Sequence, residues 1–360
     1  MGVFVFLPLV LPLSAWPVAR LGETRLHPRT ATRLLTAVAV VMAMCSTLCL
    51  ALVMAVGTAQ LPGNPLPDAW SDPRVRAAVP YDEIAGRAAI CALTLVVAAC
   101  ARTLLRHRRV IRRTHRALGP GPGTSRTRAR VRTRARVRVR TRAKSRHTDG
   151  THLAPWTAGA RRPGPAARPG QGPGPTVAVL PDGAPYAYAL PGGRGRIVVS
   201  TALLAGLAPG ERRALFAHER AHLRAGHHRH LLAAHLAARA NPFLRPLRTA
   251  VLYTAERWAD EEAARTVGDR RTVARAIGRA ALLSADTPGP TLAALAATGP
   301  VPRRVAALLA PAPMARTWPP ACTPVGLAAW GAAAGALVSA MSSANSAVTL
   351  YLILHATASM

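Results

Sequence analysis

The chain has 360 residues, half of them hydrophobic, and a formal net charge of +32. One soluble globular domain cannot combine such an apolar composition with so much like charge, so the two properties must lie in different segments. Met1–Ala19, Leu34–Gly57 and residues 317–360 indeed contain no Asp, Glu, Lys or Arg. The composition therefore excludes an ordinary soluble enzyme and indicates an integral membrane protein.

Four segments are predicted to cross a membrane, a task that takes about 20 apolar residues per helix. Residues 34–57 fit this requirement best. Residues 3–19 contain three prolines and lack the positive start of a signal peptide, so we expect a retained helix there. The third span is predicted at 84–105, and the fourth, with a short tail, within 317–360. The membrane region thus comprises residues 1–105 and this last segment.

The distribution of basic residues predicts the orientation, because cytoplasmic loops are enriched in Lys and Arg. Arginines fill the loop before residue 34, acids dominate residues 58–83, and a heavily basic run begins at Arg102. We therefore expect a multi-pass protein of the cell membrane. We expect its N-terminus, its second loop (58–83) and its C-terminus to lie outside. The first loop and the region from Arg102 to Arg316 are expected in the cytoplasm.

Residues 106–175 are predicted to be a disordered cytoplasmic linker rich in Arg, Pro and Gly. Arginine occupies every even position from Arg126 to Arg142, and the basic tract continues to Arg146. We expect the tract Arg126–Arg146 to contact the anionic inner leaflet of the membrane. Nucleic acid is a weaker alternative partner, because no aromatic residues interleave the arginines to stack on bases.

Residues 176–316 are predicted to form the folded domain. Short apolar runs bounded by Pro and Gly predict strands between 176 and 200. Helical periodicity then predicts helices from near Glu211, over 249–267 and 271–283, and within 292–309. The expected fold class is α+β and helix-dominated, with this domain inserted between the transmembrane helices.

The run His218-Glu219-Arg220-Ala221-His222 has the form H-E-x-x-H. Residues four apart lie on one face of a helix, so His218 and His222 can chelate one Zn²⁺. Glu219 can then reach a metal-bound water and act as the general base of peptide hydrolysis. None of the five cysteines lies between Arg102 and Arg316, so this domain offers no thiolate ligand.

Two residues compete as the third metal ligand. His228 has the spacing of the metzincin motif, but the glycine of that motif is displaced to Gly226. Glu256, with Asp260 four residues later on the same helical face, fits a site built from two helices. We therefore predict His218, His222 and Glu256 as ligands, with Asp260 hydrogen-bonded to a ligand histidine. The alternative for Glu256 and Asp260 is a salt-bridged surface pair.

The remaining candidates are assigned more ordinary roles. Four further histidines are expected to be polar or cationic surface residues near the inner leaflet: His227, His228, His230 and His235. Tyr253 or Arg257 could stabilise the oxyanion formed during hydrolysis, and the spacing does not select between them.

The stretch from Ile197 to His228, followed by "ERWADEEAA", resembles the integral-membrane zinc peptidases of family M56, which include the BlaR/MecR antibiotic sensors. Related M48 peptidases of the HtpX type share the paired motifs. The resemblance implies zinc, a gluzincin-like domain and, in the sensor members, cleavage of a cytoplasmic DNA-binding repressor. Because the chain ends at Met360 without a penicillin-binding domain, we do not expect it to sense β-lactams.

Together these features predict an integral-membrane zinc metalloendopeptidase. Its expected substrate is a cytoplasmic or membrane-proximal protein, with a transcriptional regulator as one candidate. Two alternatives stay open. One is an M48-like quality-control protease with broad substrate choice. The other is a catalytically inactive membrane scaffold that binds anionic partners through the arginine tract.

Overall fold

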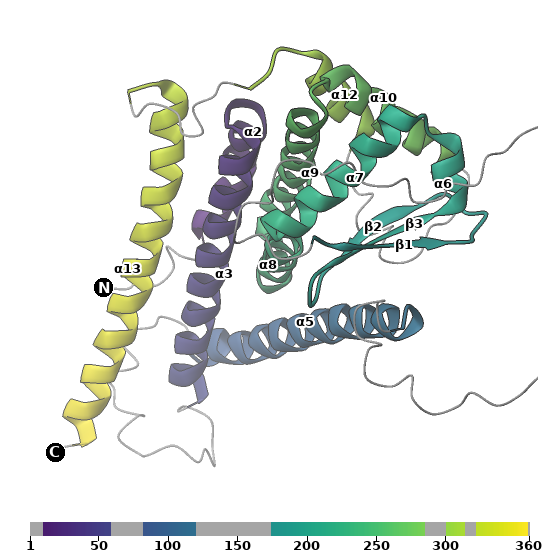
Figure 1. Cartoon of the computed structure of the whole chain (residues 1–360). Helices are drawn as coiled ribbons and strands as arrows, with labels where there is room; N and C mark the ends of the chain where they lie inside the picture. The colour runs from purple at the N-terminus through teal and green to yellow at the C-terminus, as the bar shows by residue number, and fades with distance from the viewer. Residues whose placement is uncertain (1–9, 59–81, 120–173, 285–299, 314–321, 359–360) are drawn as a thin grey trace, which may run out of the picture.

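A computed structural model describes residues 10–58, 82–119, 174–284, 300–313 and 322–358 (Figure 1). Helices dominate the described chain, and one small sheet accompanies them, which confirms the predicted helix-dominated α+β class. In chain order the elements are η1 (Leu11–Ser14), α2 (Ala15–Arg25), α3 (Pro28–Thr58), α5 (Asp82–Ala117), β1 (Thr176–Leu180), β2 (Ala187–Leu190), β3 (Arg196–Ser200), α6 (Thr201–Gly206), α7 (Pro209–Ala225), α8 (His227–Ala240), η3 (Pro242–Leu244), α9 (Arg245–Val267), α10 (Arg270–Ser284), α12 (Val301–Leu309) and α13 (Pro324–Ala358).

Three helices of the described chain are long and apolar enough to cross a membrane. They are parts of α3, α5 and α13, over Pro28–Ala55, Gly86–Ala117 and Pro324–Thr349. These correspond to the second, third and fourth predicted spans. The predicted span at 3–19 lies partly outside the described residues. Its described end forms the 3-10 turn η1 and the start of α2, with Pro12 and Pro17 in their first turns.

The helix α5 extends further than the sequence predicted. The predicted disordered linker begins at residue 106, but α5 continues to Ala117, and Gly119 then adopts a left-handed backbone with φ of 62°. The extension follows from the local sequence, since Arg and Leu favour a helix and residues 106–118 contain no Gly or Pro. The linker prediction is therefore wrong for residues 106–117, and residues 120–173 lie outside the described residues.

The sheet has three strands in the order β1–β3–β2, with β1 parallel and β2 antiparallel to β3. Within the described chain β2 is therefore an edge strand. Its neighbour β3 is buried from Ile197 to Ser200. The Ser200 hydroxyl accepts a hydrogen bond from the Leu203 N–H and so caps α6. The sheet thus leads directly into the helices that hold the predicted site.

The helix α9 lies at the centre of the folded domain, among α2, α3, α7 and α8 (Figure 1). It begins at Arg245, earlier than the predicted residue 249, because Pro246 falls in the first turn, where its missing N–H costs nothing. It ends at Gly268, as the sequence predicted. Most of its side chains between Leu247 and Ala264 are buried, as expected for a helix covered on several sides.

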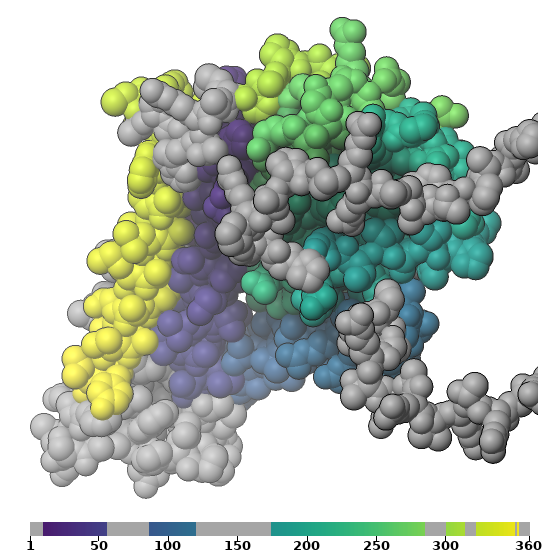
Figure 2. All heavy atoms as spheres, viewed as in Figure 1, coloured from purple at the N-terminus to yellow at the C-terminus, as the bar shows by residue number. Residues whose placement is uncertain are grey.

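The membrane helix α3 is also part of the core of the folded domain. Leu35 on α3 packs in one hydrophobic cluster with Leu247 and Val251 on α9. The Thr32 hydroxyl donates to the Thr254 hydroxyl at 3.1 Å, and α13 covers another side of α3 (Figure 2). The domain is therefore packed directly onto a predicted transmembrane helix.

Candidate metal centre

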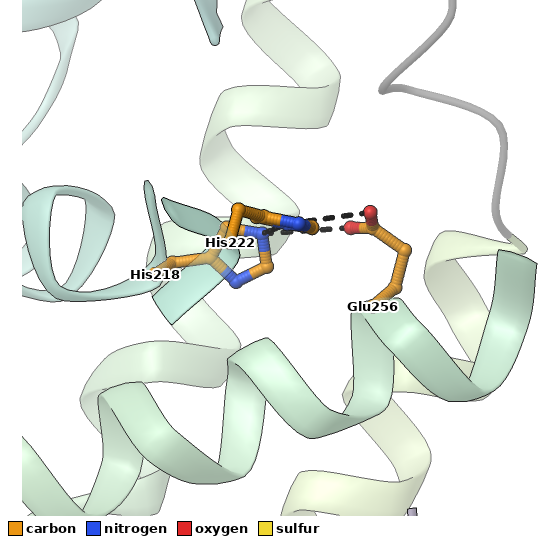
Figure 3. Close-up of side chains that lie close together, drawn as sticks. All are labelled: His218, His222 and Glu256. Carbon is orange, nitrogen blue, oxygen red and sulfur yellow. Dashed lines mark hydrogen bonds and ion pairs between the residues drawn. The ribbon is translucent and has the colours of Figure 1, made fainter. Parts of the chain in front are cut away.

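The helix α7 presents His218 and His222 one turn apart. At its start the Ala208 N–H donates to the Glu211 carboxylate at 2.8 Å, which satisfies one of the free donors of the first turn. The Nε2 atoms of His218 and His222 lie 3.0 Å from each other. Both rings therefore direct the same nitrogen toward one point (Figure 3).

The third member of the group comes from α9. The Glu256 carboxylate lies 3.5 Å from His218 Nε2 through one oxygen and 3.4 Å from His222 Nε2 through the other. Glu256 is buried, and its side chain faces the two rings from the neighbouring helix (Figure 3). The structure therefore brings together the three residues that the sequence selected, and their ligand atoms lie within 4.8 Å of one another.

The spacing of these atoms is close enough for one metal ion. A tetrahedral zinc bound at about 2.1 Å places its ligand atoms about 3.4 Å apart. The two Nε2 atoms lie 3.0 Å apart, and each lies 3.4–3.5 Å from a different oxygen of Glu256. Two imidazole nitrogens and one carboxylate are also a common zinc ligand set, with a fourth position left for a reactant. In donor type and in spacing, the group fits zinc.

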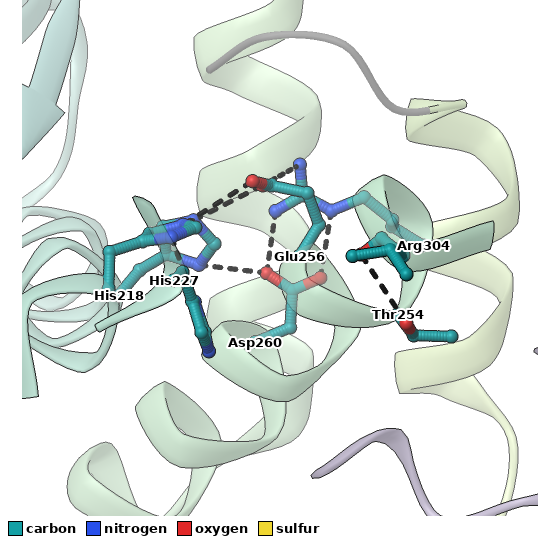
Figure 4. Close-up of polar contacts among 8 residues, drawn as sticks. His218, His227, Thr254, Glu256, Asp260 and Arg304 are labelled. Atoms are coloured by element: carbon teal, nitrogen blue, oxygen red, sulfur yellow. Dashed lines mark hydrogen bonds and ion pairs between the residues drawn. The ribbon is translucent and has the colours of Figure 1, made fainter. Parts of the chain in front are cut away.

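Asp260 and Arg304 contact this group on the side that faces away from the ligand position. Asp260 Oδ1 lies 2.9 Å from His218 Nδ1, the nitrogen that faces away from the ligand position. Arg304, on α12, donates to both Asp260 oxygens at 2.8 and 2.6 Å and lies 3.0 Å from Glu256 (Figure 4). Both carboxylates are buried, so the alternative of a surface salt-bridged pair is wrong.

The charges in this cluster favour a cation at the ligand position. Burial disfavours a charged ring, but the contacts with Asp260 and Glu256 outweigh it and raise the pKa of His218 to about 10. Burial alone would raise the pKa of Glu256, whereas His222, Arg304 and His218 together hold it well below its usual value. An anionic site that attracts a proton this strongly will also attract a divalent cation in its place.

Glu219 lies on α7, next to His218, and its side chain reaches the strand β2 of the sheet. Its side chain is buried, and it accepts a hydrogen bond from the Ala189 N–H on the edge strand β2. Burial raises the pKa of Glu219 to about 7, and the positive charge of His218 partly opposes this rise. A carboxylate with a pKa near neutrality can both accept and return a proton, as a general base requires.

His227 is the clearest correction to the predicted surface histidines. It is completely buried, and its Nδ1 lies 2.9 Å from Nδ1 of His222. Burial lowers the pKa of His227 to about 2, so the ring is neutral. His228, His230 and His235 are only partly buried, which leaves their predicted polar role open.

The two candidates for oxyanion stabilisation have other contacts. Tyr253 is buried beneath the guanidinium of Arg303, which lies 4.2 Å from the centre of its ring. Arg257 pairs with Glu261 at 3.0 Å. Neither contact selects one of them for the oxyanion, so that role stays a prediction. Arg304 was not predicted at all, although it is the cation closest to the two buried carboxylates.

Comparison with known proteins identifies the segment that carries this motif. A family model described as Peptidase family M48 matches residues 164–239, which include His218, Glu219 and His222. This segment is similar to the M48 peptidases. No curated protein and no solved structure matches the chain. The M48 match and the three apolar helices together indicate a membrane metallopeptidase. The resemblance to family M56 remains a prediction.

Proposed function

We propose that the protein is a membrane-embedded zinc endopeptidase in which His218, His222 and Glu256 hold the metal. The single observation that carries this proposal is the convergence of their ligand atoms, which lie within 4.8 Å of one another on two neighbouring helices. Asp260 orients His218, and Arg304 compensates the charge of the two carboxylates. A degenerate scaffold would have lost part of this set, whereas here every member is present and paired, and Glu256, Asp260 and Arg304 are buried.

Zinc at this position would polarise the scissile carbonyl and lower the pKa of a bound water to about 7. Glu219 would take the proton of the attacking water and deliver it to the leaving nitrogen. One C–N bond breaks, one C–O bond forms, and the products are a carboxylate and an amine. The raised pKa of Glu219 suits both halves of this proton transfer.

The sheet offers a way to bind the substrate backbone. β2 is an edge strand of the described sheet, and the Ala189 N–H on it reaches Glu219. An extended peptide added to this edge would therefore pass beside the proposed base. This arrangement favours an endopeptidase that binds the main chain of its substrate, with little dependence on the identity of the substrate's side chains.

The position of the site supports a membrane-proximal substrate. The hydrogen bond between Thr32 and Thr254 lies two residues from Glu256 along α9, at the start of the predicted membrane helix α3. The basic end of α5 supports a cytoplasmic location under the positive-inside rule. The M48 match favours the quality-control reading. Repressor cleavage and contact of Arg126–Arg146 with the anionic leaflet stay further predictions.

The test is cleavage of fluorescein-labelled casein by detergent-purified, zinc-loaded protein. We expect Glu219→Gln to retain zinc and lose at least about 100-fold in cleavage rate, because the amide cannot accept the proton. Glu262→Gln, which changes a partly buried partner of the exposed Arg265, is the matched control and should cleave normally. Undiminished cleavage by zinc-loaded Glu219→Gln would remove Glu219 as the base. Zinc-loaded wild-type protein without cleavage would favour the scaffold.

A further inference from the structure

We propose that His227 is a positioning residue that holds His222 in the orientation and tautomer needed to bind the metal. This inference rests on the proposed function of the site and adds a residue to it. It begins from the 2.9 Å contact between Nδ1 of His227 and Nδ1 of His222.

The two ligand histidines have matching outer contacts. The Nε2 atoms of His218 and His222 face each other and Glu256, so their Nδ1 atoms face outward. Asp260 lies against the outer nitrogen of His218 (Figure 4). His227 lies in the same way against the outer nitrogen of His222. A metal-bound histidine usually donates its other N–H to such a partner, which sets the ring orientation and raises the basicity of the ligand.

The protonation states follow from this geometry. When Nε2 of His222 donates its lone pair to a metal, its Nδ1 carries the proton. That N–H can only be accepted by an unprotonated Nδ1 of His227, so the proton of His227 lies on Nε2. His227 is completely buried, so its ring can offer Nδ1 to His222 without competition from solvent. Its Nε2 has no hydrogen-bond partner among the described residues, so the contact with His222 is the one hydrogen bond of its ring there.

The backbone has a specific feature that makes the contact possible. In a continuous helix a residue five positions on is rotated by about 140°, so it would face away from His222. Here α7 ends at Gly226, whose φ of 64° is left-handed, and α8 begins at once with His227. This break turns the chain and places His227 beside His222. Gly226 lies one position too late for a metzincin motif. Its left-handed backbone instead places His227 beside His222.

Charge balance explains why a neutral ring accepts here. The buried cluster contains the carboxylates of Glu219, Glu256 and Asp260, against the single guanidinium of Arg304. A divalent metal would neutralise the remaining negative charge. A further carboxylate at position 227 would leave an uncompensated buried charge, which is costly. A neutral imidazole supplies the acceptor without that cost.

Packing against Trp258 fixes the orientation of the His227 ring. The centres of the two rings lie 4.7 Å apart. Trp258 in turn lies beneath the guanidinium groups of Arg29 and Arg33, at 5.7 and 5.4 Å. The imidazole is therefore held between a ligand histidine and a large side chain that α3 also contacts. This contact limits rotation of the ring.

The experiment compares His227→Leu with His227→Asn in the detergent-purified full chain. Leu fills the buried space without an acceptor, whereas the Asn side-chain oxygen can occupy the place of Nδ1. We expect Leu to raise the zinc dissociation constant about 10- to 100-fold, measured by competition with a zinc-binding dye. We expect Asn to restore most of the affinity. His228→Leu, one residue along the same helix and only partly buried, is the control and should bind zinc normally.

A second readout is the visible spectrum of the cobalt-substituted protein, which reports the geometry of the ligands. We expect His227→Leu to change it and His227→Asn to resemble the wild type. Equal zinc affinity and equal cobalt spectra for wild type and His227→Leu would overturn the role of His227 and leave the metal site standing. Absence of zinc binding by the wild type would instead overturn the site itself, and with it this role. Equal loss in Leu and Asn would assign His227 to packing alone.

Discussion

Asp260 and Glu256 share one guanidinium in the buried part of the site. Arg304 is itself buried, and it binds Asp260 with two hydrogen bonds. Removal of one partner of such a pair leaves a buried charge without compensation. Stability at the residue scale should therefore depend strongly on this arginine.

We predict that Arg304→Met destabilises the protein by about 3–5 kcal/mol. The measurement is the midpoint of thermal unfolding in detergent. Arg303→Met, which changes the neighbouring and more exposed arginine paired with Glu23, should have a much smaller effect. An Arg304→Met protein as stable as Arg303→Met would contradict this account of the buried pair.

At this scale the sequence predicted the ligands better than their support. His218, His222, Glu256 and Asp260 were predicted because helical spacing places each pair on one face. Arg304 lies far along the chain from Asp260, and nothing distinguishes it among the 47 Lys and Arg residues. His227 was assigned to the surface because an unbroken helix would direct it away from His222. Only Gly226 signalled otherwise.

The junction between α7 and α8 is decisive at the scale of elements. Gly226 is left-handed there, and a side chain at this φ is strained whatever space surrounds it. We predict that Gly226→Ala destabilises the protein by about 1–2 kcal/mol. It should also weaken zinc binding, because the turn sets the place of His227. The measurements are thermal unfolding of the metal-free protein and competition for zinc.

Gly278→Ala in α10 provides the control for that prediction. Among the described residues, and apart from the neighbouring backbone of the helix itself, no atom lies within 4 Å of the position a methyl group would take. This substitution should leave zinc binding unchanged and stabilise the helix slightly. If Gly226→Ala behaved in the same way, the left-handed junction would have no role in the site.

The elements themselves were largely predictable, because their signals are local. The three strands coincide with short apolar runs bounded by Pro and Gly, and Gly268 marks the end of α9 as expected. The boundaries that differ depend on subtler effects. Pro246 occupies the first turn of α9, so this helix begins before the predicted residue 249, and arginines after residue 105 continue α5. The strand order β1–β3–β2 could not be derived from these patterns.

For the molecule as a whole, α3 has two environments. Its first half packs against α8 and α9, where Leu35 is fully buried. Further along, Met44 is 67% exposed on the surface of the protein. Composition identified this helix as a membrane span, but composition does not reveal which protein surface a span contacts. The packing of the domain onto α3 was therefore not predicted.

We predict that Leu35→Ala destabilises the protein by about 2–5 kcal/mol, because it creates a cavity between α3 and α9. Met44→Ala on the same helix is the matched control. It should have little effect, because the Met44 side chain is exposed on the surface and its removal leaves no cavity in the core. Thermal inactivation in detergent measures both. Equal midpoints for the two variants would show that α3 is a simple anchor.

The central claim is that two helices, α7 and α9, together build one zinc site. The most direct measurement is elemental analysis of the detergent-purified protein beside His218→Ala and Glu256→Ala. The account predicts one zinc per wild-type chain and loss of the metal in both variants. Zinc lost in His218→Ala but retained in Glu256→Ala would contradict the two-helix site. So would a wild-type protein without zinc after purification in zinc-containing buffer.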